Sequence, residues 1–121
     1  MAQKKNAIQT NTVASARLNN ARISARKARY ILDMIRGKQV EPALQVLEHS
    51  PRKGARFVEK LLKSAVANAR EKSGVDIDDL WITACQADEG KTMKRYLPRA
   101  QGRATPLRKR SSHISVFLGE K

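Results

Sequence analysis

The sequence predicts an α+β fold, in which a compact body of three helices packs on a small antiparallel sheet and a long β-hairpin protrudes from it. Apolar residues recur every three or four positions in three segments between residues 24 and 72, which is typical of helices. Within residues 80–87 and 114–118 aliphatic side chains recur at every second position, at Leu80, Ile82 and Ala84 and at Ile114, Val116 and Leu118, which is typical of strands. The segment between these strands is basic, free of acidic residues and poor in apolar ones, so it cannot bury itself.

A chain of 121 residues suits one domain with a modest core. We expect this single domain to span residues 1–121 and to have three parts. Residues 1–11 are polar and are expected to be flexible. Residues 12–90 and 114–121 are expected to form the globular body, and residues 91–113 the basic hairpin extension.

Residues 12–22 are weakly strand-like, and the first helix is expected directly after them. Ser24 is the candidate N-cap, residues 28–35 carry the apolar period, and Gly37 supplies the stop. The face opposite the apolar one carries three cations: Arg26, Lys27 and Arg29. This helix therefore has one side for the body and one for a partner.

Two further helices follow. Pro42 suits the first turn of a short one, which Ser50 and Pro51 end. The third runs from about residue 52 to 72 and has the most sustained apolar period of the chain. Gly74 is expected to close it.

The two alternating segments are expected to pair antiparallel, with the basic stretch as a hairpin between them. Pro98, Gly102 and Pro106 favour a turn around residues 98–104. About ten residues a side, at ~3.3 Å each, would carry the hairpin roughly 30 Å beyond the body.

The net charge is +14 and the pI is about 10.7. Residues 1–40 hold nine basic residues and one acidic one, and residues 91–113 hold eight basic residues and none that is acidic. Residues 41–90 are close to neutral. A single charged run is often only a solvated face, but two acid-poor runs around a neutral body favour a nucleic-acid-binding surface.

Folded RNA, read by its shape and phosphates, fits this surface best. A stacking platform for single strands needs more aromatic residues than the five in this chain. Met93, Tyr96 and Leu97 would add non-ionic contacts, although Met93 and Leu97 could instead cover the body. The candidate RNA-binding residues are Arg17, Arg22, Arg26, Lys27, Arg29, Lys38, Lys91, Lys94, Arg95, Arg99, Arg103, Arg108, Lys109, Arg110 and His113.

The sequence carries no signature of an enzyme, a cofactor or a metal site. Its six glycines form neither a phosphate loop nor a dinucleotide fingerprint. Asp76, Asp78 and Asp79 lack the spacing of a calcium loop, so a turn from helix to strand is favoured. Cys85 is expected to be a small buried side chain in a strand, and one Cys with two scattered His does not suit zinc. No apolar run approaches the ~20 residues that span a bilayer, so no membrane partner is expected.

Several short motifs occur in a specific order. Ala-Arg-Ile-Ser-Ala-Arg-Lys-Ala-Arg spans 21–29, Ile-Arg-Gly-Lys spans 35–38 and Ser-Ala-Val-Ala-Asn-Ala spans 64–69. Met-Lys-Arg at 93–95, Pro-Arg-Ala at 98–100, Gly-Arg-Ala at 102–104 and Ser-His-Ile at 112–114 follow. In this order and spacing the chain resembles, over residues 21–118, the bacterial family of large-subunit ribosomal protein twenty-two.

The resemblance implies a structural constituent of the large ribosomal subunit, cytoplasmic and ribosome-bound, that binds and organises large-subunit ribosomal RNA. It implies that the hairpin tip lines the nascent-peptide exit tunnel. The implied partners are this RNA, neighbouring large-subunit proteins, and nascent peptides and macrolides near the tip. The tip residues by resemblance are Met93, Lys94, Arg95, Arg99, Ala100, Gln101, Gly102 and Arg103. Gln101 stands where a basic residue is typical, which would make the tip locally less positive.

Two other classes of function compete with this interpretation. A free nucleic-acid chaperone or a DNA-binding protein would have the same charge, but would be expected to show a helix-turn-helix or a dimer seam, which the sequence lacks. A small RNA-processing enzyme would need a placed acid–base pair, and the basic stretch contains no carboxylate.

Overall fold

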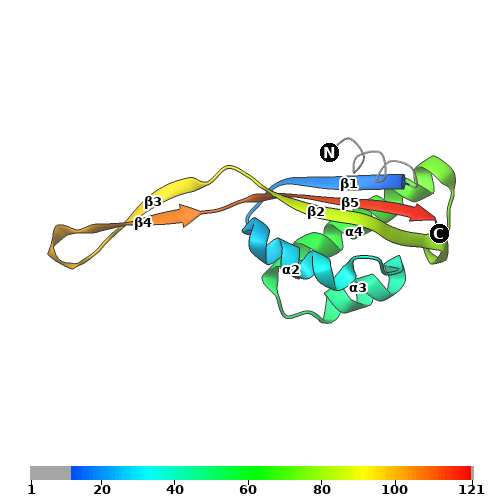
Figure 1. The fold of residues 1–121 in the computed structure, drawn as a ribbon, viewed down its shortest axis with the longest axis horizontal. Helices are drawn as coiled ribbons and strands as arrows, with labels where there is room; N and C mark the ends of the chain where they lie inside the picture. Colours follow the sequence, from blue (N-terminus) through cyan, green and yellow to red (C-terminus); the bar gives the residue numbers. More distant parts are fainter. Residues whose placement is uncertain (1–11, 121) are drawn as a thin grey trace.

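The computed structural model of the protein describes residues 12–120, so the segment expected to be flexible, 1–11, lies outside the described residues. It shows a body of helices on a sheet, and a long two-stranded arm that leaves one end of the body (Figure 1). The predicted α+β fold is confirmed. The helices and main strands are β1 (Thr12–Ala21), α2 (Ala25–Ile35), α3 (Val40–His49), α4 (Lys53–Ser73), β2 (Leu80–Glu89), β3 (Met93–Pro98), β4 (Ala104–Lys109) and β5 (Ser112–Glu120).

The body sheet has the order β1-β5-β2, and both pairings are antiparallel. Ile114 of β5 lies opposite Leu18 of β1 and opposite Ala87 of β2. The predicted pair of alternating segments is therefore real, and β1 adds a third strand on the far side of β5. The three helices lie along one face of this sheet (Figure 1).

The helix boundaries follow the predicted signals. The Ser24 hydroxyl accepts a hydrogen bond from the Lys27 N–H at 3.4 Å, so Ser24 is the N-cap of α2. Pro42 lies in the first turn of α3. Gly74 closes α4 in the left-handed conformation at φ +63°, with its N–H bonded to the Arg70 carbonyl at 3.0 Å.

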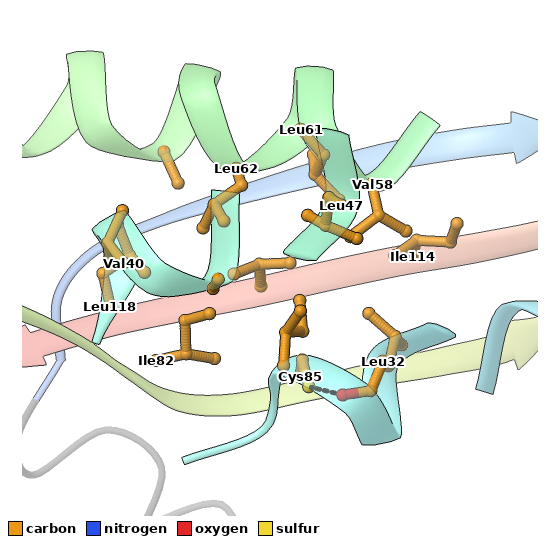
Figure 2. Close-up of a cluster of buried hydrophobic side chains, with 14 of the residues drawn as sticks. Leu32, Val40, Leu47, Val58, Leu61, Leu62, Ile82, Cys85, Ile114 and Leu118 are labelled. Carbon is orange, nitrogen blue, oxygen red and sulfur yellow. Dashed lines mark hydrogen bonds between the residues drawn. The ribbon is translucent and has the colours of Figure 1, made fainter. Parts of the chain in front are cut away.

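The core fills the space between the helices and the sheet. Figure 2 shows Leu32, Leu47 and Val58 of the three helices turned toward Ile82 and Ile114 of the strands. All five are at most 1% exposed. These apolar faces are the ones that the helical and strand periods predict.

Cys85 is buried in this core, as predicted, and its Sγ lies 3.7 Å from the Leu32 carbonyl oxygen (Figure 2). Burial raises the pKa of the Cys85 thiol, because the thiolate would lose its hydration. The side chain therefore stays neutral and packs as a small apolar group.

The acidic segment after α4 is the predicted turn from helix to strand. Ile77–Asp79 form a single 3-10 turn, η1, and the Asp79 N–H bonds to the Asp76 carbonyl at 3.0 Å. Across residues 12–120, no group of three or more His, Cys, Asp or Glu side chains could hold a metal ion. None of the helices in this part of the chain is long and apolar enough to cross a membrane.

The arm is a separate two-stranded sheet. Residues of β3 and β4 pair one to one, from Met93 opposite Lys109 to Pro98 opposite Ala104. A short 3-10 turn, η2 (Ala100–Gly102), closes the far end, where the Arg99 N–H donates to the Arg103 carbonyl at 2.6 Å. The predicted turn at 98–104 is thus confirmed.

We expect the arm to exchange its amide hydrogens quickly in the free protein, from residue 91 to 112, while residues 57–69 of α4 exchange slowly. A lone two-stranded ribbon is marginal in water, and almost no residue of this one is buried, whereas α4 packs against the core. Hydrogen–deuterium exchange of the free chain measures this, with β5 as an internal reference for a well-covered strand. Strong protection of residues 91–112 without RNA would contradict it.

Candidate nucleic-acid interface

The arm places like charges opposite one another. Lys94 lies directly across from Arg108, and both are exposed. Directly opposed like charges destabilise a strand pair. No acidic residue lies between positions 91 and 113 to offset them. The ribbon therefore presents a surface that a polyanion would stabilise.

The arm also has exposed apolar groups. Tyr96 is 70% exposed, Leu97 38% and Leu107 39%. Successive side chains in a strand point to opposite faces, so Tyr96 and Leu97 lie on different faces of the ribbon. Leu97 is exposed and Met93 does not belong to the body core, so neither covers the body. They remain available to a partner.

The basic side chains of α2 and its C-cap have two different roles. Arg26 and Lys27 are exposed, and none of their side-chain nitrogens is used in an ion pair among the described residues. Arg29 is also exposed, but its Nε donates to the Ala87 carbonyl at 3.1 Å. Arg36, two turns later, donates to the Cys85 carbonyl at 3.0 Å. Arg29 and Arg36 thus fasten α2 to β2, while Arg26 and Lys27 face outward.

Next to this face lies a cavity of about 700 Å³, which we call the α2–α4 hollow. It opens between the segment leading into α2, α2 itself and the start of α4. Six cations and no acidic residue line it: Arg22, Arg26, Lys27, Arg52, Lys53 and Arg110. Four of these six are residues that the sequence predicts to bind RNA.

A second cavity of about 390 Å³, the arm-base hollow, lies where the arm leaves the body. It shares Arg26 and Arg110 with the α2–α4 hollow and adds Lys94 and Arg108, while Glu89 is its one acidic lining residue. The junction beside it is held by a hydrogen bond from the Gly90 N–H to the Ser111 carbonyl at 2.9 Å. The two hollows therefore form one basic path from α2 to the arm.

The other predicted residues lie apart from this path. Arg17 is exposed in the middle of β1, opposite Ser115. Lys38 is exposed near the start of β2, the end away from the arm, where its carbonyl accepts from the Ile82 N–H at 3.0 Å. His113 is half-buried, and its Nδ1 accepts from the Asn20 N–H at 3.1 Å.

The remaining predicted cations belong to the arm. Lys91 and Lys109 flank the arm base, while Arg95, Arg99 and Arg103 lie along the outer arm.

The sequence interpretation missed three residues of the path. Arg52 and Lys53 lie at the start of α4, 17 and 18 positions after the end of α2 at Ile35, and only the packing of the two helices brings them to the hollow. Tyr30 was missed although it lies one turn beyond Arg26 on the basic face of α2. An aromatic residue on a basic helix face was the available signal.

The comparisons with known proteins agree with one another. The family model for "Ribosomal protein L22p/L17e" matches residues 16–119 of the chain. The large ribosomal subunit protein uL22 of Syntrophotalea carbinolica is 51% identical over 108 residues, which cover 89% of this chain and 98% of that protein. The protein of the same name from Caldicellulosiruptor saccharolyticus is 51% identical over 118 residues, 95% of this chain and 97% of that one. That of Geobacter sulfurreducens is 49% identical over 108 residues, 89% and 97% of the two chains.

We expect replacement of Arg26 and Lys27 by Ala to weaken binding to a folded RNA and to make it less salt-dependent. If both side chains neutralise phosphates, the slope of log affinity against log salt should become shallower by about 1.4 to 1.8. Filter binding or fluorescence anisotropy over a salt series measures this.

The matched control is Arg70→Ala with Lys72→Ala, which removes the same two charges from the end of α4. This control should leave the slope close to that of the natural chain. An unchanged slope in the Arg26 and Lys27 variant would show that this face is only solvated.

Proposed function

Because this chain belongs to the ribosomal protein L22p/L17e family, we propose that it is a structural constituent of the large ribosomal subunit, where it binds and organises ribosomal RNA. Relatives that carry the name of a large-subunit protein align with nearly all of this chain and over nearly all of their own length. Its place is then on cytoplasmic ribosomes, beside neighbouring large-subunit proteins.

The observation that carries the proposal is the arm. Lys94 and Arg108 face each other with no acidic residue to separate them, and the strands that hold them have almost no buried surface. Such a ribbon gains stability only when phosphates surround it, since Lys and Arg release counterions from RNA as they bind. A folded RNA on both sides of the arm provides that environment.

The protein acts in this role without a catalytic step. Within the arm and its base the available groups are cations, backbone amides, a few hydroxyl and apolar side chains, and one carboxylate, that of Glu89. These groups position phosphates and bases, but they offer no acid–base pair for a proton transfer. Its mechanism is to bind RNA and to shape it.

Sedimentation of a cell lysate tests the proposal against a free chaperone or DNA-binding protein. We expect an antibody to the chain to detect it almost wholly in the fractions of large subunits and intact ribosomes. It should remain there after a wash at moderate salt, because many phosphate contacts act together. Recovery of most of the protein at the top of the gradient, or with nucleoid DNA, would contradict the proposal.

We also propose that the outer arm, about residues 93–103, lines the nascent-peptide exit tunnel, as the family resemblance implies. The geometry supports this. Six paired residues on each side, at ~3.3 Å each, carry the tip roughly 20 Å beyond Met93, and a ribbon of two strands is thin enough to pass between RNA segments. Gln101 lies at φ +64° in the closing turn, at the extreme end. Nascent peptides and macrolides would pass near this end.

Deleting residues 93–95 is expected to alter macrolide inhibition or peptide-dependent stalling, while the protein still enters large subunits. The deletion removes the partners of Lys109, Arg108 and Leu107. Because three is an odd number, the remaining strand also flips its side-chain alternation, so Tyr96 must face the opposite side. Translation assays with and without a macrolide, on purified ribosomes of known protein content, measure the effect.

Substitution of Lys94 and Arg95 by Gln is the control, since it removes the same two charges and keeps the strand register. An effect of the deletion that this control lacks identifies the shifted ribbon as the cause. Full incorporation of the deleted chain together with a natural drug response and natural stalling would overturn the placement of the outer arm.

A further inference from the structure

The α2–α4 hollow has an apolar floor. Ile31 is 1% exposed, and Ile23 is half-buried beside it. Gly54 lies over both, and a Cβ at that position would overlap the terminal methyl groups of Ile23 and Ile31. The start of α4 therefore approaches α2 closely, and the bottom of the hollow offers only methyl groups and backbone.

One wall of the hollow is aromatic. Tyr30 is 51% exposed, on the same side of α2 as Arg26 and Lys27. The Arg52 guanidinium carbon lies 6.0 Å from the centre of the Tyr30 ring, at the outer limit of a cation–π contact. A single exposed aromatic residue is ordinary on a protein surface. This one is different because it lines a cavity whose charged lining residues are all basic.

The combination selects one kind of ligand. A small anion would need the cations but not the apolar floor, and an apolar peptide would need the floor but not six cations. A nucleotide needs both, since its base has two flat π faces and its phosphates are negative. The volume of about 700 Å³ lies within the roughly 300–1,000 Å³ of sites that take small molecules, so one nucleotide fits.

The position of the hollow indicates how a bound RNA strand would bring one of its nucleotides into it. The hollow shares Arg26 and Arg110 with the arm-base hollow, so an RNA strand can run between the two along these shared cations. Proteins read RNA most often at loops and bulges, where bases are unstacked and can lie on aromatic side chains. Only one aromatic side chain lines the hollow, so one base is taken.

We propose that the α2–α4 hollow is a nucleotide pocket that holds one unstacked base of the bound RNA against Tyr30, with the flanking phosphates on Arg52, Lys53 and Arg110. This inference rests on the proposed function and deepens it, since it adds a local, non-ionic contact to a surface that otherwise reads shape and phosphates. Through Arg52 and Lys53 the pocket also brings α4 into contact with the RNA, although the other contacts of α4 are with the core.

Binding of the full chain to transcribed large-subunit ribosomal RNA of Geobacter sulfurreducens tests the pocket, since that organism's uL22 is 49% identical over 108 residues. Tyr30→Ala should lower the affinity roughly 5- to 150-fold, the range for one lost base–aromatic stack, and leave the salt slope unchanged. Tyr30→Phe should bind like the natural chain, because stacking does not use the hydroxyl. Thermal unfolding of each variant shows whether the half-exposed site affects folding.

A second pair of variants tests the role of the cations in the pocket. Arg52→Ala with Lys53→Ala should weaken binding and make the salt slope shallower. The matched control, Lys60→Ala with Arg70→Ala, removes the same charges from exposed positions of the same helix outside the hollow. It should bind like the natural chain.

Ultraviolet cross-linking of the same complex gives a second readout, and a peptide that begins at Tyr30 should carry a nucleotide. Equal affinity of the Tyr30→Ala variant and the natural chain, with no such adduct, would overturn the pocket while the proposed function stands. Equal weakening by Tyr30→Phe would show a hydroxyl contact and also overturn stacking. Failure of the natural chain to bind this RNA more tightly than an unrelated transcript would refute the proposed function itself.

Discussion

The pairing of β5 with β1 on one side and β2 on the other is the interaction on which the rest of the structure depends. Ile114, Val116 and Leu118 of β5 are fully buried under the helices, so this strand holds both the sheet and the core. The β2–β5 pair continues to Glu89 opposite Ser112, and the arm begins just beyond. The direction of the arm is therefore set by the β2–β5 pair of the sheet (Figure 1). None of the residues of β3 and β4 belongs to the core.

The cations of the chain are divided between two tasks. Arg29 and Arg36 donate to carbonyls of β2, and Arg56 donates to three carbonyls at the end of α3, so these side chains hold the body together. Hydrogen bonds of this kind leave the formal charge in place but fix the side chain. Among the described residues, no side-chain hydrogen bond joins the cations of the arm and of the two hollows to the body, so these cations are available to a partner. A count of basic residues alone does not separate these groups.

Local signals made much of the fold predictable. Ser24 and Gly74 end their helices through hydrogen bonds with near neighbours in sequence, so their roles can be seen without a structure. The change of apolar period likewise identified the strands. The α2–α4 hollow could not be predicted in this way, because Tyr30 and Arg52 meet only after two helices pack. The same holds for Arg29, whose bond to β2 depends on tertiary contact, and for the place of β1 at the outer edge of β5.

Because β5 lies between β1 and β2, the body sheet cannot form until β5 has been synthesised. Thr12 at the start of β1 pairs with Gly119, and β5 is the last of the described strands to be synthesised. Until then β1 and β2 have no common neighbour, and the helices and the local β3–β4 pair are the elements whose residues are all present. Contacts so distant in sequence slow folding and expose unpaired strands for longer. A newly made chain would thus carry its highly charged arm before it has a finished sheet, and early capture by RNA or by a chaperone would protect it during that interval.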